Sequence, residues 1–161
     1  MIESAYKIKY IISDIDGVLT DGRFVMDENG NESKQLCYRD LDAIGIGRIS
    51  GIEFFFITGE SGKMVETISK RFNVADVVQD APDKLLAIKK LCKDKDMDPK
   101  DVCYIGDADR DVAAIIFVGL GVVPFDGSKK AITVANYVTS AKGGFGVLFE
   151  VVSKLVDDIN K

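Results

Sequence analysis

Short apolar runs alternate with amphipathic segments along most of this chain, and that alternation limits its fold more than any other feature. Six runs are expected to form strands, at Ile8–Ser13, Glu53–Thr58, Asp76–Val78, Val102–Ile105, Leu120–Val123 and Tyr137–Thr139. The segments between them are expected to form helices, at Asp42–Ser50, Lys63–Phe72, Asp83–Asp94, Arg110–Val118, Ser128–Val134 and Phe145–Asn160. Strands that alternate with helices favour a mostly parallel sheet covered by helices, so we predict an α/β fold.

One segment departs from this alternation. Arg23–Met26 and Ser33–Leu36 flank Asp27–Asn31, which contains an Asn-Gly pair, a strong turn signal. We predict a β-hairpin inserted at about residues 22–37. A hairpin alone is marginally stable, so its apolar side chains need cover from the site or from another subunit; they are Phe24, Val25 and Met26.

Length and composition describe an ordinary globular protein. The 161 residues suffice for one domain with a hydrophobic core, so we expect residues 1–161 to form a single domain. The apolar runs are too short to cross a bilayer, and the first residues lack the layout of a secretory signal. The net charge is −5 and there is no basic cluster. We therefore expect a cytoplasmic protein with neither nucleic-acid nor membrane partners.

The chain contains no histidine, which excludes several catalytic classes. Ser-His-Asp and Cys-His catalysis and histidine-ligated zinc are impossible, so acid–base chemistry falls to carboxylates. The three scattered cysteines, Cys37, Cys92 and Cys103, are interpreted as reduced structural thiols.

Polar residues follow successive strands of the predicted sheet. Ligands of open α/β sheets bind at the carboxyl ends of the strands, so residues that are distant in sequence can converge there. The set consists of Asp14 and Asp16 after the first strand, Thr58-Gly59-Glu60 after the second, Lys84 after the third, and Asp107 with Asp111 after the fourth. Each residue alone could be a turn or helix-cap residue; their order indicates a functional site.

These residue types suit phosphoryl transfer. Asp14 can act as a nucleophile that forms an aspartyl-phosphate. Asp16 can protonate the leaving alkoxide and later deprotonate the attacking water. Thr58 and the amides after it can hold phosphoryl oxygens, while Lys84 neutralises charge on the nucleophile and on the transferring group.

The same carboxylates predict a magnesium site. Mg²⁺ prefers oxygen ligands and keeps several waters, so Asp14, Asp107 and a backbone carbonyl would suffice. We expect the metal ligands to come from Asp14, Asp16 and Asp107. Asp111 is placed to support the site, by orienting either Lys84 or a metal-bound water.

This ordered set resembles the haloacid dehalogenase superfamily of phosphatases. Asp14-Ile15-Asp16-Gly17-Val18-Leu19-Thr20 is similar to its first motif, Thr58-Gly59 to its second, Lys84 to its third, and Gly106-Asp107 with Asp111 to its fourth. The resemblance implies a Rossmann-like, doubly wound fold and Mg²⁺ dependence.

Further segments are similar to a capless branch of that superfamily. They are Asp21-Gly22, the hairpin, Asp42–Ile46, Asp83-Lys84 and Gly143–Gly146. They resemble 3-deoxy-D-manno-octulosonate 8-phosphate (KDO 8-phosphate) phosphatases and phosphatases of nonulosonate 9-phosphates such as KDN 9-phosphate. The resemblance implies a sugar acid phosphate substrate, a homotetramer assembled through the hairpin, and a neighbouring subunit that helps close the site. It also implies substrate contacts at Asp42, Thr58, Gly59 and Glu60.

Four residues depart from the patterns of that branch. Ala108 and Arg110 replace an acid and an amide of the fourth motif. Phe145 stands where octulosonate phosphatases often carry arginine, which weakens a contact to the sugar carboxylate. Glu60 replaces an arginine and resembles the nonulosonate enzymes; it can accept hydrogen bonds from hydroxyls but would repel an anion.

Alternative functions use the same residues differently. One is a silent assembly module related to the C-terminal domain of some CMP-sialic acid synthetases; the altered fourth motif favours it, whereas the intact Asp14 and Asp16 argue against it. A receiver-type phospho-acceptor domain would need its acceptor after the third strand, where Asp80 stands. A mutase would need a cap domain, for which the chain has no room.

Overall fold

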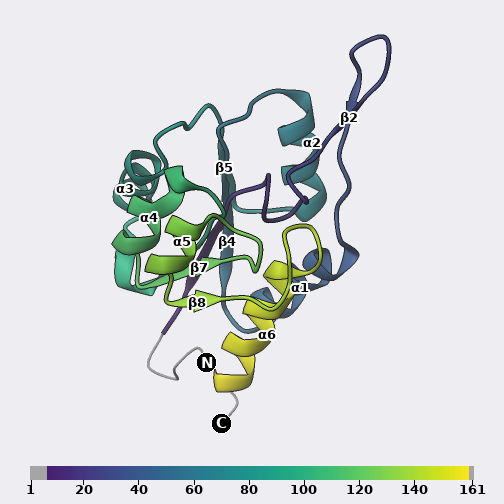
Figure 1. The fold of residues 1–161 in the computed structure, drawn as a ribbon. Coiled ribbons are helices and arrows are strands. Elements are labelled where there is room, and N and C mark those ends of the chain that lie inside the picture. The colour runs from purple at the N-terminus through teal and green to yellow at the C-terminus, as the bar shows by residue number, and fades with distance from the viewer. Residues whose placement is uncertain (1–6, 160–161) are drawn as a thin grey trace.

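A single six-stranded parallel sheet forms the centre of the molecule (Figure 1). The computed structural model describes residues 7–159. The strand order is β5-β4-β1-β6-β7-β8, and every pairing is parallel. The strands are β1 (Tyr10–Ser13), β4 (Glu53–Ile57), β5 (Asp76–Val78), β6 (Val102–Ile105), β7 (Leu120–Val123) and β8 (Tyr137–Val138). The predicted parallel α/β fold is confirmed.

Helices cover both faces of the sheet, as expected for a doubly wound fold. They are α1 (Tyr38–Ile49), α2 (Lys63–Phe72), α3 (Lys84–Asp94), α4 (Val112–Phe117), α5 (Lys129–Val134) and α6 (Val147–Ile159). Helices α1, α2 and α6 pack on one face, and α3, α4 and α5 pack on the other. Between residues 7 and 159 there is no cap domain over the strand ends, and no helix is long and apolar enough to span a membrane.

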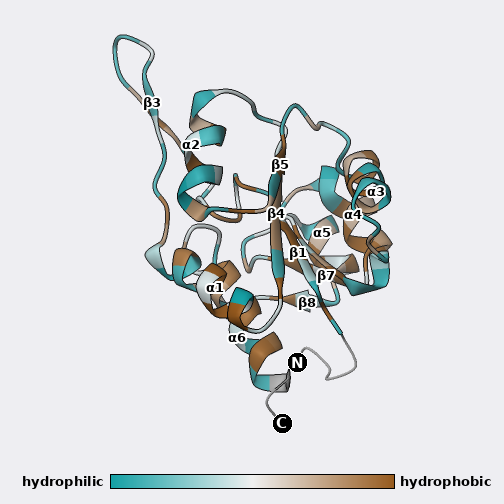
Figure 2. Ribbon diagram, turned by 180° about the vertical axis from the view of Figure 1, so that it is seen from behind, coloured by the Kyte–Doolittle hydropathy of each residue, from teal (hydrophilic) through white to brown (hydrophobic). Residues whose placement is uncertain are grey.

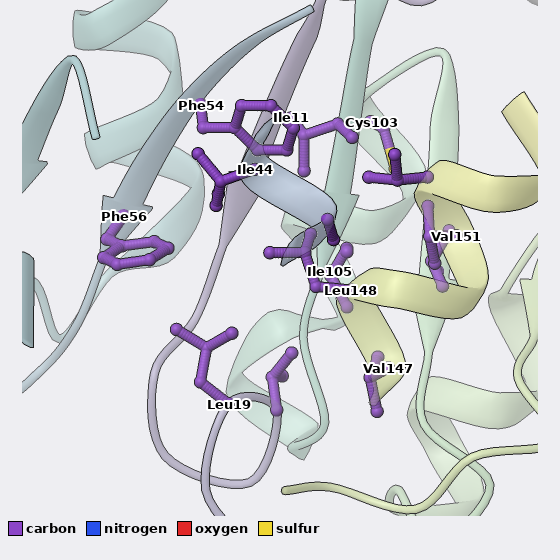
Figure 3. Close-up of a cluster of buried hydrophobic side chains, with 14 of the residues drawn as sticks. Ile11, Leu19, Ile44, Phe54, Phe56, Cys103, Ile105, Val147, Leu148 and Val151 are labelled. Atoms are coloured by element: carbon purple, nitrogen blue, oxygen red, sulfur yellow. The ribbon is translucent and has the colours of Figure 1, made fainter. Parts of the chain in front are cut away.

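Strand β4 shows why the sheet must be covered on both faces. Successive side chains of a strand point to opposite faces, and here every one of the last four is apolar. Phe54 and Phe56 enter the cluster with α1, α2 and α6 (Figure 3), whereas Phe55 and Ile57 enter the cluster with α3 and α4. Each buried side chain of this size stabilises the fold by about 1.5–3 kcal/mol.

Several element boundaries differ from those predicted, each for a local reason. Helix α1 begins at Tyr38, four residues before the predicted start at Asp42. The sequence does not reveal this start because the N-cap residue, Cys37, forms no side-chain capping hydrogen bond. The expected Arg110–Val118 helix begins instead as a 3₁₀ turn, Asp109–Asp111. Helix α6 begins at Val147 because Gly146 has a φ of +97°, which no helix contains; the predicted end at Asn160 lies outside the described residues.

The inserted hairpin forms as predicted, with shorter strands. Strands β2 (Val25–Met26) and β3 (Glu32–Ser33) pair antiparallel, and Asp27 closes the turn by accepting the amides of Asn29 and Asn31 at 2.9 and 2.8 Å. Figures 1 and 2 show the hairpin extending beyond α2, away from the sheet. Its apolar side chains are therefore uncovered in the single chain: Phe24 is 54% exposed, Val25 68% and Met26 54%.

Candidate active site

A buried ion pair lies at the carboxyl end of β1. The Lys84 ammonium lies 2.9 Å from Asp14 Oδ2, and the two side chains are 0% and 1% exposed. Lys84 also donates to the Ile57 carbonyl at 2.9 Å, while the Ile15 amide donates to Asp14 Oδ1 at 2.7 Å. Burial raises the pKa of the Asp14 carboxyl, and the Lys84 charge opposes that rise. The two residues predicted as nucleophile and charge-neutralising cation are thus in direct contact.

Three carboxylates form a cluster beside this pair. One oxygen from each of Asp14, Asp107 and Asp111 lies within 4.8 Å of the others. Burial, and then the charges of Asp111 and Asp14, raise the pKa of Asp107 to about 7. Among the described residues, the buried Asp107 Oδ1 accepts no hydrogen bond, and Asp14 Oδ2 has only its ion pair. Such crowded, incompletely bonded oxygens fit a hard divalent cation such as Mg²⁺.

Gly17 allows Asp107 to approach the first motif. Its φ is +83°, and a Cβ added there would lie 2.8 Å from Asp107 Oδ1 and nearer still to Cγ and Oδ2. The Gly143–Gly146 loop packs against the same turn, since the Gly144 amide donates to the Val18 carbonyl at 2.9 Å. Glycine at position 17 therefore satisfies two requirements, a left-handed backbone and the space for a carboxylate.

Asp16 lies outside the carboxylate cluster and has partners of its own. Thr20 Oγ1 donates to Asp16 Oδ1 at 3.1 Å, and the Lys34 ammonium lies 2.8 Å from Asp16 Oδ2. Lys34 follows β3 of the hairpin, and sequence reasoning missed it. The available signal was the position of the hairpin, inserted directly after the acidic motif. That the metal is also held by Asp16 remains a prediction.

The Thr58 turn follows β4, the strand that pairs with β1 on one side. Thr58 is buried, and its hydroxyl accepts the Glu60 amide at 3.1 Å. The backbone of the turn is fixed by the Ala81 amide, which donates to the Thr58 carbonyl at 3.0 Å. Glu60 itself is exposed, and its contact with substrate remains a prediction.

Asp111 organises the loop after β6. Tyr104 donates its hydroxyl to Asp111 Oδ1 at 2.7 Å, and the amides of Asp107 and Ala108 donate to Oδ2 at 3.1 and 2.8 Å. No bond joins Asp111 to Lys84 within residues 7–159, so the carboxylate holds Asp107 in place and faces the cluster. These bonds also explain the 3₁₀ turn.

Asp42 is not brought to this group. It lies exposed on α1, at a shallow hollow shared with Arg48 and with Arg71 at the end of α2. None of the residues that line this hollow belongs to the cluster of Asp14, Asp107 and Asp111. A substrate contact at Asp42 remains a prediction.

The haloacid dehalogenase-like hydrolases are defined by a doubly wound parallel sheet and by a site at its strand ends. In that site a buried aspartate–lysine pair lies beside further carboxylates. The model of that family matches residues 58–150, and the chain belongs to it. Its curated relatives include the 3-deoxy-D-manno-octulosonate 8-phosphate phosphatase of Escherichia coli (strain K12), which is 35% identical over 156 residues, covering 97% of this chain and 83% of the relative.

Solved structures agree with this assignment. The 3-deoxy-D-manno-octulosonate 8-phosphate phosphatase from Moraxella catarrhalis, in complex with magnesium, phosphate and KDO, has a TM-score of 0.92 at 30% identity, covering 96% of this chain and 89% of the other. The Yersinia pestis enzyme of the same name has a TM-score of 0.92 at 33% identity, covering 98% and 85%. The chain is thus homologous to phosphatases along nearly its whole length.

Proposed function

We propose that this chain is a Mg²⁺-dependent phosphatase that hydrolyses the phosphomonoester of a 2-keto-3-deoxy sugar acid. The candidate substrates are KDO 8-phosphate and a nonulosonate 9-phosphate such as KDN 9-phosphate. The buried contact between Asp14 and Lys84, beside the carboxylate cluster, is the observation that carries the proposal. The substrate class is supported by the names of the relatives.

Two displacements at phosphorus account for the reaction. In the first, an Asp14 carboxylate oxygen attacks phosphorus, the bond to the sugar oxygen breaks, and Asp16 gives its proton to the departing alkoxide. In the second, Asp16 takes a proton from water, whose oxygen attacks phosphorus, and the bond to Asp14 breaks. Inorganic phosphate leaves and both aspartates return to their starting states. Thr58 and Lys84 hold phosphoryl oxygens and balance their charge.

The carboxylate cluster would hold the metal. Asp14 and Asp107 offer the incompletely bonded oxygens, and Asp111 fixes the Asp107 loop behind them. Bound there, Mg²⁺ supplies positive charge that lowers the repulsion between the phosphoryl oxygens and the Asp14 carboxylate.

Phosphate release by matched variants tests the mechanism. Asp14→Asn keeps the shape of the side chain but removes the nucleophile, so we expect activity to fall at least 1,000-fold, on the order of other nucleophile losses. Asp80→Asn is the control, because it makes the same chemical change at an exposed acid with a φ of +50° that asparagine tolerates. Wild-type activity in Asp14→Asn would refute the mechanism, and loss of activity in Asp80→Asn would favour the receiver-type alternative.

A steady-state comparison of substrates decides between the candidates. KDO 8-phosphate, KDN 9-phosphate and N-acetylneuraminate 9-phosphate differ in the sugar and share the phosphoester, so the ratio of their kcat/KM values measures discrimination by the sugar contacts. A preference for the nonulosonates that is lost in Glu60→Gln would assign that contact to Glu60. Inertness toward the whole panel would favour the silent assembly module instead.

The exposed apolar side chains of the hairpin support the proposal that the chain assembles into a homotetramer. Phe24, Val25 and Met26 are more than half exposed in the single chain, and an apolar cluster of this kind is typical of a surface that another subunit covers. Light scattering on Val25→Lys tests the assembly: we expect a shift from tetramer to smaller species. Ile116→Lys, which places a charge at an apolar side chain of similar exposure on α4, is the control.

A further inference from the structure

An arginine beside the active site has no ion-pair partner in the described part of the chain. Arg110 lies in the 3₁₀ turn after β6, between two acids that are already engaged. Asp109 pairs with Lys130 at 2.8 Å, and Asp111 accepts Tyr104 and two amides. Within residues 7–159, the Arg110 guanidinium forms no ion pair, and the side chain is exposed.

The Arg110 guanidinium lies beside Gly59, in the turn that follows a different strand of the sheet. A Cβ added at Gly59 would lie 3.6 Å from Arg110 Nη1. Gly59 follows β4 and Arg110 follows β6, and these strands flank β1 on its two sides. Because neighbouring strands lie about 4.8 Å apart, the two loops start about 10 Å from each other. The arginine side chain therefore reaches across the carboxyl end of β1, where Asp14 stands.

The charges around the site indicate what an exposed arginine can bind there. The substrate proposed above carries a phosphate and a carboxylate, and it must approach a group of aspartates. Lys84 is buried against Asp14 and Lys34 is partly buried and paired with Asp16, so neither is an exposed cation that an approaching anion meets first. The exposed Arg110 forms no such pair among residues 7–159, so its guanidinium is available to an approaching anion.

We propose that Arg110 binds an oxyanion of the substrate at the entrance to Asp14. This inference rests on the proposed phosphatase function and adds a binding residue to it. The planar guanidinium donates two parallel hydrogen bonds to a phosphoryl group or a carboxylate, which a lysine cannot do. Gly59 contributes by presenting no side chain, so that the guanidinium can lie close to the backbone of the Thr58 turn.

Kinetics of three variants test the assignment. Arg110→Ala removes the guanidinium, Arg110→Lys keeps the charge without the paired donors, and Lys130→Ala removes a charge from the neighbouring exposed ion pair as the control. We expect Arg110→Ala to lower kcat/KM about tenfold or more, mainly through KM, with Arg110→Lys intermediate and Lys130→Ala within about twofold of wild type.

Two substrates distinguish the sources of the oxyanion. A loss with both KDO 8-phosphate and p-nitrophenyl phosphate assigns the phosphoryl group, because the second compound has no carboxylate. A loss confined to KDO 8-phosphate assigns the sugar carboxylate. If Arg110→Ala matches Lys130→Ala with both substrates, the assignment is overturned.

Calorimetric binding separates this inference from the proposed function. Inorganic phosphate and unphosphorylated KDO are titrated into wild type and Arg110→Ala, and no turnover is required. We expect one of the two anions to bind about tenfold more weakly to the variant, which corresponds to about 1.4 kcal/mol. If the wild type hydrolyses nothing but the binding loss is present, the proposed function fails and the Arg110 site stands. Equal binding by both proteins, in an active enzyme, overturns the Arg110 site and leaves the proposed function standing.

Discussion

Replacing Gly17 by alanine tests whether the first motif and Asp107 depend on each other. The new Cβ would lie 2.8 Å from Asp107 Oδ1 and closer to two further carboxyl atoms, whereas ordinary contact begins at 3.4 Å. The carboxylate must therefore retreat by about 1 Å, a displacement that can cost about 100-fold in rate. The left-handed φ of +83° adds about 1–2 kcal/mol of backbone strain, or roughly 2–8 °C in Tm.

Gly22→Ala separates the two effects. Gly22 has a φ of +75°, so alanine there suffers similar strain, but its Cβ would have no neighbour closer than 3.8 Å. Phosphate release and thermal melts are measured for both variants. We expect similar losses of Tm, with a fall in kcat/KM of about 100-fold for Gly17→Ala alone. Equal kcat/KM in the two variants would refute the claim that glycine at position 17 makes room for Asp107.

Three further perturbations follow from other contacts. Lys34→Met is expected to lower kcat about tenfold by freeing Asp16, with Lys9→Met at a remote ion pair as the control. Burial raises the pKa of Asp40 to about 6. The free energy of unfolding is therefore expected to fall by up to about 3 kcal/mol as the pH rises from 4 to 6, because the carboxyl ionises in the unfolded chain before it does in the folded one. In thermal melts, Asp40→Asn should make Tm less dependent on pH over this range. Mg²⁺ is expected to raise the Tm of wild type and leave that of Asp107→Asn unchanged.

Much of the fold could be predicted because its strands are simple in pattern. Strands β5, β6 and β7 and helix α2 have the predicted bounds, since each is an apolar or amphipathic run followed by a polar residue, a glycine or a proline. The boundaries that failed are set by groups with no local signature. Cys37 provides no cap for α1, and the turn before α4 is shaped by the Asp111 side chain.

Part of the candidate site could likewise be predicted from the sequence, and part could not. The convergence of Asp14, Lys84 and Asp107 could be predicted from strand order, because parallel strands present their carboxyl ends at one edge of a sheet. The ion pair between Lys34 and Asp16 could not, because it depends on how a projecting hairpin folds back at its base. The reach of Arg110 toward Gly59 likewise depends on a side-chain direction that no sequence spacing encodes.

The ion pair between Lys34 and Asp16 links the base of the hairpin directly to Asp16, the general acid and base of the proposed reaction. A subunit that binds the exposed tip of the hairpin and shifts its base also changes the surroundings of Asp16. Thermodynamic linkage makes such a coupling reciprocal, so a ligand that alters the Lys34 contact also alters the free energy of subunit association. We therefore expect the affinity for substrate to depend on protein concentration across the range in which the assembly dissociates.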